Sequence, residues 1–355
     1  MANNTARLGD LATYINGYAF KPADWGDTGL PIIRIQDLTG NSYQLNRYDG
    51  EYPERIEVND GDVLISWSAS LGVYVWQRGK ALLNQHIFKV VFDKLPVNKD
   101  YFVFAVEHKL AEMEAKTHGA TMKHIVKKDF DGTTIPYPSI EKQAEIADHL
   151  RRITGLIDRQ TEQLLLLDQL VKSRFIELFG DPVINPKGFP CYTVGEVIDF
   201  QGGSQPDKKF FEYEASPDNI RLIQIRDYKS DKYITYIPKT MAKRFCTADD
   251  IMIGRYGPPI FQILKGIEGS FNVALMKATP QMGNREFIRQ FLKQDCLLEY
   301  LEGLSKRTAG QDGIQMDKLK AYPFPYPPME MQEQFAAFVE QTDKSKLCGK
   351  MEVAA

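Results

Sequence analysis

The chain has 355 residues, of which 43% are hydrophobic and 26% charged, a composition typical of a globular protein of about two domains. The net charge of −3 gives no overall bias toward nucleic acids or anionic membranes, and no apolar run approaches the ~18 residues of a membrane helix. Without an apolar leader, and with four cysteines too widely spaced for a metal site or disulfide framework, we expect a cytoplasmic chain with no membrane anchor, metal or cofactor.

The first third of the chain is predicted to be rich in short strands. Runs of β-branched and aromatic residues alternate there with Gly, Pro, Asn and Asp clusters, which is typical of strands and turns. Apolar residues with helical spacing follow, and Pro136 and Pro138 then end regular structure because proline lacks a backbone donor. The pattern predicts strands at 31–35, 63–67 and 86–92 and an amphipathic helix over 101–116.

The clearest element comes next. Apolar residues from Ile146 to Leu178 recur at alternating spacings of four and three. This seam predicts a helix over 141–179, ~58 Å long at ~1.5 Å per residue and ended by Gly180 and Pro182. A small domain spans only ~30 Å, so a long antiparallel coiled coil between two domains is favoured over a helix packed on one domain.

The second half of the chain repeats the first at an offset of 186–190 residues. Four blocks return in the same order, which indicates a tandem duplication. The second copy is again predicted to hold strands, at 220–225 and 233–237, and one amphipathic helix over 288–301. The matching blocks are 8–11 with 194–197, 33–37 with 223–227, 62–65 with 250–253 and 135–143 with 324–332.

We therefore expect a mixed α/β fold with two duplicated domains, a long spacer helix and a shorter C-terminal helix. The seam of the C-terminal helix fails after Val339, because Thr342 and Lys346 stand at apolar positions, so only about three turns are expected. The expected segments are 1–138 for the first domain, 139–182 for the spacer helix, 183–328 for the second domain, and 329–355 for the short second spacer helix and its tail.

This arrangement resembles the specificity (S) subunit of type I restriction–modification systems. The resemblance rests on IPYPSIEKQ at 135–143, its counterpart FPYPPMEMQ at 324–332, and the helix ending KSRFIELFGDP at 172–182. It implies two target-recognition domains that each read half of a bipartite, asymmetric site in double-stranded DNA. It also implies a non-catalytic subunit whose spacer helices recruit modification (methyltransferase) subunits, with a restriction subunit acting through the same complex.

A stand-alone nuclease or methyltransferase is the alternative. Asp100 followed by 114–116 (EAK) formally matches a nuclease string, but Glu114 is expected on a solvated helix face. The stretch 257–261 (GPPIF) lacks the amide or carboxylate of an adenine methyltransferase motif, and no Gly-rich phosphate loop occurs. A coiled-coil scaffold that carries sugar- or protein-binding domains is a second alternative.

Candidate DNA contacts follow from the duplication. Matched positions such as Asp37 and Asp227, or Gly9 and Gly195, should maintain the fold, whereas loops that differ between the copies should read bases. Basic clusters precede both Pro-rich stretches and are expected to contact phosphates, which position the protein without specifying sequence. The candidate DNA-binding residues are Trp67, Ser68, Ser70, Thr121, Lys123, Lys127, Lys128, Arg255, Tyr256, Arg307, Gln311 and Lys318.

A short second spacer helix would leave part of the first one uncovered. The apolar stripe nearest the first domain consists of Ile146, Leu150, Ile153 and Ile157. Monomers seldom expose such a stripe, so we expect it to bind a modification subunit or, in a homodimer, a second copy of the chain. The alternative is an impaired subunit whose stripe stays exposed.

Overall fold

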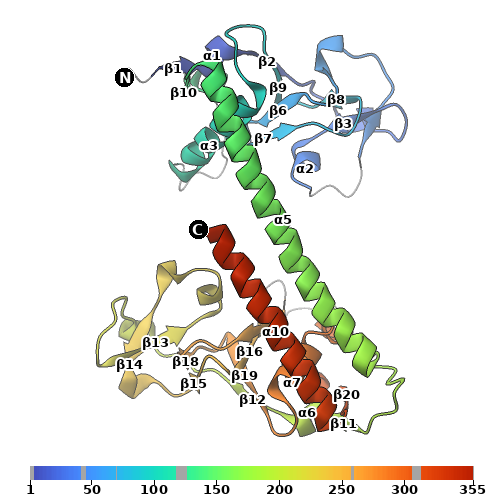
Figure 1. The fold of residues 1–355 in the computed structure, drawn as a ribbon, viewed down its shortest axis with the longest axis vertical. Helices are drawn as coiled ribbons and strands as arrows, with labels where there is room; N and C mark the ends of the chain where they lie inside the picture. The colour runs from blue at the N-terminus through green and yellow to red at the C-terminus, as the bar shows by residue number, and fades with distance from the viewer. Residues whose placement is uncertain are drawn as a thin grey trace. The chain divides into compact units, whose positions relative to one another are not determined.

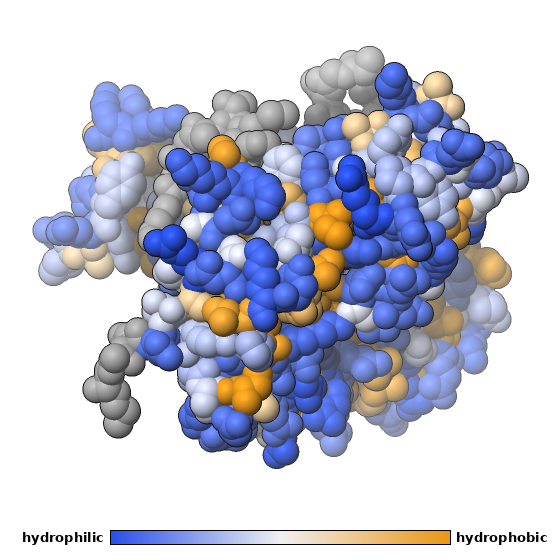
Figure 2. All heavy atoms as spheres, turned by 90° about the horizontal axis from the view of Figure 1, so that it is seen from above, coloured by the Kyte–Doolittle hydropathy of each residue, from blue (hydrophilic) through white to orange (hydrophobic). Residues whose placement is uncertain are grey.

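The computed structural model describes residues 4–40, 45–68, 70–116, 126–256, 260–305 and 313–354. Two compact units divide the chain, Met1–Ile157 and Asp158–Ala355. None of the helices described is long and apolar enough to cross a membrane. Figure 2 shows a face on which hydrophilic side chains surround small, separate apolar groups, as on ordinary globular proteins.

The first unit contains two four-stranded sheets, with strand orders β2-β9-β6-β7 and β4-β3-β8-β5, and a two-stranded ribbon β1-β10. The predicted strands are confirmed to within one or two residues. Its strands are β1 (Thr5–Arg7), β2 (Thr13–Asn16), β3 (Leu30–Ile33), β4 (Arg47–Tyr48), β5 (Glu57–Val58), β6 (Val63–Ser66), β7 (Gly72–Val75), β8 (Ala81–Leu83), β9 (Ile87–Val91) and β10 (Thr134–Pro136). Its helices are α1 (Leu8–Leu11), α2 (Ile35–Leu38), α3 (Lys99–Lys116) and α4 (Lys127–Gly132), with 3₁₀ turns η1 (Pro22–Asp24) and η2 (Glu54–Ile56).

The second unit has the same strand orders, β12-β19-β16-β17, β14-β13-β18-β15 and β11-β20. Its strands are β11 (Cys191–Thr193), β12 (Ile198–Gly202), β13 (Asn219–Ile223), β14 (Tyr236–Pro238), β15 (Phe245–Cys246), β16 (Ile251–Gly254), β17 (Gln262–Lys265), β18 (Gly269–Phe271), β19 (Leu275–Pro280) and β20 (Pro323–Pro325). Its helices are α6 (Val194–Val197), α7 (Arg285–Leu292), α8 (Asp295–Ser305), α9 (Met316–Ala321) and α10 (Met329–Ala354), with 3₁₀ turns η3 (Lys208–Phe210), η4 (Ile225–Tyr228), η5 (Asp231–Tyr233) and η6 (Lys239–Met241).

The duplication extends to single pairings. In each copy one parallel strand pair interrupts an otherwise antiparallel pattern: Ile32 lies opposite Leu82, and Leu222 lies opposite Ser270. The four-residue helices α1 and α6 pack against α4 and α9. A Cβ on Gly9 of α1 would lie 3.1 Å from Asp131, closer than most Cβ contacts, and Gly195 meets α9 in the same way. This close packing supports the scaffold role expected of both glycines.

The long helix α5 (Ile140–Phe179) has 40 residues and confirms the predicted spacer helix (Figure 1). Within the second unit, α10 lies beside its C-terminal half in the expected antiparallel sense. Phe335 contacts the rings of Phe175 and Phe179, at centroid distances of 5.6 and 5.4 Å, and Lys346 reaches Asp168 further back along α5. These aromatic side chains join the main core of the unit.

The C-terminal helix is longer than expected, with 26 residues where about three turns were predicted. Its polar seam positions are accommodated without breaking the helix. Thr342 donates a hydrogen bond from Oγ1 to the Phe338 carbonyl at 2.9 Å, and Lys346 forms ion pairs with Asp168 and Asp343 at 2.6 and 3.4 Å. The polar residues at seam positions therefore change the contacts of the helix and do not end it.

Two predicted elements of the second copy differ from the structure. The strand predicted at 233–237 forms only as the short β14, because Tyr233 belongs to η5. The single helix over 288–301 is two helices, α7 and α8, because the apolar residues change phase: Phe291 is buried on α7 and Leu297 on α8, six positions later. A continuous helix would keep a seven-residue spacing, so the break at Lys293 brings both into one core.

The two Pro-rich signatures share one structural role. The buried amide of Gln143 accepts a hydrogen bond from the Asn98 backbone N–H at 2.9 Å and donates to the Pro138 carbonyl at 2.9 Å. Gln332 accepts from the Asn284 N–H at 2.8 Å and donates to the Pro327 carbonyl at 2.8 Å. Each glutamine thus ties the start of α5 or α10 to the segment that begins α3 or α7.

Candidate nucleic-acid interface

The loops predicted to read bases occupy equivalent places in the two copies. After β6, the Trp67 N–H donates to the carbonyl of His86 at 3.3 Å. After β16, the Arg255 N–H donates to the carbonyl of Ala274 at 2.9 Å. The backbone is held in the same way, while one loop carries an indole and the other a guanidinium.

In the first copy the loop is closely packed. The half-buried Trp67 ring stacks on Phe88 at a centroid distance of 5.5 Å and meets His86 edge-on at 5.1 Å. The Ser66 hydroxyl donates to the carbonyl of Ser70, which closes the loop, so that Ser70 is exposed and Ser68 half-buried. Of these side chains, Ser70 is the most available to a ligand.

His86 is a candidate that the sequence did not single out. Its φ of 72° lies in the left-handed region, which non-glycine residues seldom adopt, and its buried Nδ1 has no hydrogen-bond partner among the described residues. Strained residues of this kind cluster at functional sites. The only sequence signal for His86 is the run of polar residues 84–86, which lies between the strands β8 and β9.

In the second copy two candidate loops converge. Tyr256 is 48% exposed and pairs through an antiparallel bridge with Gly313, the last residue of the candidate loop 307–313 and its only described one. The Arg255 guanidinium lies 5.3 Å from the Tyr256 ring centroid and 3.5 Å from the Val273 carbonyl. These contacts orient a planar donor group beside an exposed aromatic ring.

The candidate phosphate contacts differ in availability. Lys127 on α4 pairs with Asp131 at 3.0 Å and lies 5.7 Å from the Tyr14 ring, so its charge is partly satisfied inside the protein. Lys128 and, on α9, Lys318 are exposed. Thr121, Lys123, Arg307 and Gln311 lie outside the described residues.

The matched aspartates are buried, as expected of scaffold residues. Asp37 is 1% exposed and accepts from the Arg34 backbone N–H at 2.8 Å, and Asp227 is 6% exposed and accepts from the Gln224 N–H at 3.0 Å. Burial raises the pKa of Asp227. Each carboxylate fixes a turn and leaves little surface for a ligand.

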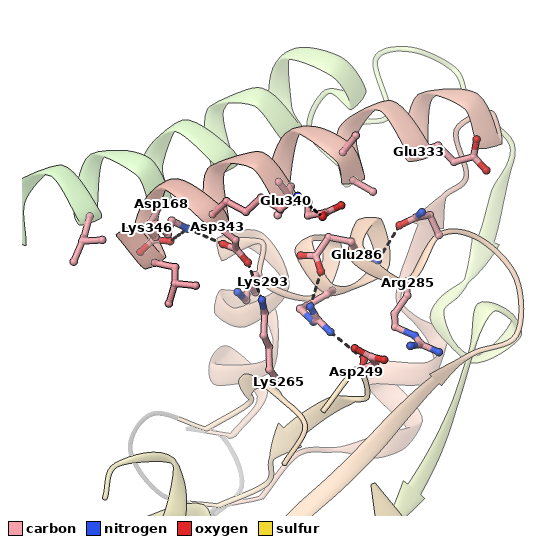
Figure 3. A pocket seen from close by; sticks show the side chains of 18 residues that line it. Asp168, Asp249, Lys265, Arg285, Glu286, Lys293, Glu333, Glu340, Asp343 and Lys346 are labelled. Atoms are coloured by element: carbon pink, nitrogen blue, oxygen red, sulfur yellow. Dashed lines mark hydrogen bonds and ion pairs between the residues drawn. The ribbon is translucent and has the colours of Figure 1, made fainter. Parts of the chain in front are cut away.

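A cleft of about 990 Å³ in the second unit lies between α7 and α10 (Figure 3) and is lined by six acidic and six basic side chains. The charges pair internally: Lys265 with Asp343 at 2.8 Å, and Lys346 with Asp168 at 2.6 Å. Burial tends to lower the pKa of Lys346, but its hydrogen bond to Asp168 outweighs burial and raises that pKa. Burial tends to raise the pKa of Asp343, but the hydrogen bond from Lys265 outweighs burial and lowers that pKa. The balanced charge gives this cleft no net attraction for DNA.

The apolar stripe on α5 is only partly buried. Ile146 is half-buried, and Leu150, Ile153 and Ile157 are 36%, 52% and 41% exposed. Asp100 of α3, which belongs to the formal nuclease string, forms an ion pair with Arg151 of α5. In the part of the chain that the structure describes, no three His, Cys, Asp or Glu residues are placed to hold a metal ion.

Comparison with known proteins gives a consistent result. A family described as "Type I restriction modification DNA specificity domain" matches residues 3–166 and 186–349. The type I restriction enzyme MjaVIII specificity subunit of Methanocaldococcus jannaschii is 24% identical over 370 aligned positions, covering 95% of this chain and 85% of that subunit. The EcoBI specificity subunit of Escherichia coli is 29% identical over 168 residues, which cover 46% of this chain and only 35% of that subunit.

The fold is also found among solved structures. The S subunit of a type I restriction–modification system from M. genitalium superposes with a TM-score of 0.58 at 14% identity, over 99% of this chain and 92% of that one. A chain from a study of complex assembly and conformational transition in the type I system superposes with a TM-score of 0.52 at 17% identity, with the same coverage. At these identities the likeness concerns the fold.

Proposed function

The chain belongs to the family of type I restriction–modification DNA specificity domains, and from this premise we propose that it reads a bipartite, asymmetric DNA site, one half with each copy. Specificity subunits recognise DNA sequence and are not catalytic. Methylation and cleavage are therefore assigned to modification and restriction subunits that assemble with the chain, and the alternative of a stand-alone nuclease or methyltransferase is not favoured.

One observation carries the asymmetry of the site. Trp67 and Arg255 follow equivalent strands and donate equivalent backbone hydrogen bonds, yet present different side chains. Arginine forms paired hydrogen bonds with guanine edges, whereas an indole cannot. Identical half-sites would need matched reading residues, so unlike loops on like frames favour unlike half-sites.

A domain exchange tests the proposal. Residues 191–328 are replaced by the second domain of another family member, and the chain is expressed with its modification subunits. Sequencing the methylome should show a change in one half-site only. Alteration of both halves, or a short continuous site in the parent, would contradict two independent reading domains.

The α5 stripe supports a proposal about partners. Leu150 and Ile153 are exposed on a helix whose C-terminal half buries one apolar face in the second unit, at Val171, Phe175 and Phe179. Burying a leucine or isoleucine contributes ~1.5–3 kcal/mol, which favours a protein partner over water. We assign this surface to a modification subunit. Light scattering of an Ile153→Lys variant should show loss of complex formation, and a wild-type chain that dimerises alone would assign the stripe to a second copy instead.

A further inference from the structure

The two copies differ in the charge of one matching region. The sheets β4-β3-β8-β5 and β14-β13-β18-β15 have the same strand order, and the segments that build most of them are residues 19–58 and 205–246, here named the first and second small lobes. The first small lobe has four Lys or Arg and seven Asp or Glu, whereas the second has nine and six. The same fold is therefore acidic in one copy and basic in the other.

Three of the nine basic residues of the second small lobe lie on the turn formed by η4 and η5, which pack together. Arg226, Lys229 and Lys232 are all exposed on this turn. Arg226 and Lys232 lie 5.9 and 5.3 Å from the ring centroid of Tyr233, whose side chain is 58% exposed. The turn thus presents cations around an exposed aromatic ring.

The acidic residues of this turn do not cancel that charge toward the solvent. Asp227 is buried and accepts the Gln224 N–H, and Asp231 forms an ion pair with Arg221 at 2.9 Å. Arg221, which is only half-buried, and Arg226 both lie 3.8 Å from Asp227, so the charge of Arg226 is partly paired within the lobe. Both carboxylates are therefore occupied by groups of the lobe itself, and the lysines remain available.

The basic turn borders the candidate reading loop. A Cβ on Gly254, the last residue of β16, would lie 2.9 Å from Cδ1 of Ile225, the first residue of η4. Arg255 and Tyr256 follow Gly254 directly. A duplex read by Arg255 would therefore have phosphates within a short distance of the turn, since phosphates flank every base pair.

The equivalent turn of the first copy lacks these cations. Gln36 stands at the place of Arg226, and Thr39 at the place of Lys229, at the offset of 190 that relates the two turns. The one arginine there, Arg34, is half-buried and lies 3.6 Å from Asp37. The fold of the turn accordingly does not require exposed lysines.

We propose that the turn from Arg226 to Tyr233 contacts DNA phosphates beside the Arg255 loop, so that the second copy supplies most of the electrostatic affinity of the chain for DNA. This inference rests on the proposed function, because it places a duplex at the Arg255 loop. Cations that neutralise phosphates release counterions, so their contribution is measured by the salt dependence of binding and is independent of sequence.

The test compares two double variants, each assembled with modification subunits. Lys229→Ala/Lys232→Ala removes two cations of the turn, and Lys21→Ala/Arg55→Ala removes two exposed cations of the first small lobe as a matched control. Binding is measured from low to moderate salt on a duplex that carries the methylated motif and on a random duplex of equal length. The turn variant should lower the slope of log K against log salt by about two and weaken both duplexes equally, while the control keeps the wild-type slope.

A single reversal, Lys232→Glu, should weaken both duplexes further than Lys232→Ala and so excludes a loss of packing as the cause. An unchanged slope in the turn variant, with wild-type discrimination between the duplexes retained, would overturn the inference and leave the proposed function intact. An equal loss of slope in the control would also overturn it. A wild-type complex that binds both duplexes alike would instead contradict the proposed function.

Discussion

Phe335 and Val339 on α10 occupy the positions that Ile146 and Leu150 occupy on α5, at the same offset of 189 residues. In the second copy these side chains are 0% and 1% exposed, because α10 packs on Phe175 and on the core below α7. In the first copy Leu150 is 36% exposed. The same helix start is thus part of a core in one copy and a partly open surface in the other, so duplication of sequence does not imply duplication of packing.

The largest effect expected from this difference is on stability. Phe335→Ala should lower the free energy of unfolding by ~3–5 kcal/mol, since it leaves a cavity among the aromatic rings of α5 and α10. Ile146→Ala, the matched control in the first copy, should cost clearly less because its side chain is only half-buried. Urea unfolding of both variants checks the ranking. Equal costs would show that the α5 stripe is buried in solution.

A second substitution addresses what the copies share. Gln143→Leu and Gln332→Leu each remove a buried amide that satisfies one backbone N–H and one carbonyl, and should each cost ~1–3 kcal/mol. Gln334→Leu, whose side chain is exposed, serves as the control and should be nearly neutral. The same urea measurement applies. A neutral result at one of the two buried glutamines would break the equivalence of the two signatures.

The sequence predicted what periodicity and repetition encode. The α5 helix is confirmed because a sustained apolar seam determines both its length and its face. The break between α7 and α8 was missed because Phe291 and Leu297 fit a single amphipathic helix approximately, and only the packed core shows the phase change. The polar seam predicts a shorter helix than the 26 residues of α10, because lysine and threonine at seam positions change the contacts of a helix without ending it.

The candidate interface was predicted less completely than the fold. The difference between the copies predicts that these two loops read bases; the bridge between Tyr256 and Gly313 brings them together, and their reading role stays a prediction. The left-handed backbone of His86 has only a weak sequence signal, the polar turn 84–86, because histidine adopts this conformation more often than most residues but still rarely. The partner of Gln143 lies 45 residues away at Asn98, so the motif was visible while its contact was not.

The reading loops offer a third prediction of intermediate size. Arg255→Ala should weaken binding to the cognate duplex by ~1–3 kcal/mol and relax specificity in one half-site only. Ser70→Ala, in the equivalent loop of the first copy, should affect the other half-site. Binding to duplexes with single substitutions in each half separates the two effects. If Arg255→Ala weakens cognate and random duplexes equally, the arginine contacts phosphate and does not read a base.

The smallest expected effect concerns pH and the ion pairs of the cleft beside α10. The pKa of Asp343 is lowered in the folded chain, because the ion pairs with Lys265 and Lys346 outweigh burial. A carboxylate whose pKa is lower when folded than when unfolded stabilises the fold above the ordinary pKa of aspartate, and this contribution is lost as the pH falls through the lowered value. For a partly exposed pair the contribution is ~0.2–1 kcal/mol.

Asp343→Asn should therefore destabilise the chain slightly at neutral pH and make no difference in acid, where the wild-type carboxylate is protonated. Urea midpoints measured from pH 7 down to pH 3 for wild type and variant should converge at the acidic end. Glu330→Gln, on the first turn of the same helix and without an ion pair among the described residues, is the control and should run parallel to the wild type. Because the first copy has no ion pair equivalent to Lys346–Asp168 on its half of α5 in the described residues, this pH dependence belongs to the second copy alone. Parallel curves for Asp343→Asn and wild type would show that the ion pairs do not hold α10 in place and that its apolar contacts with Phe175 suffice.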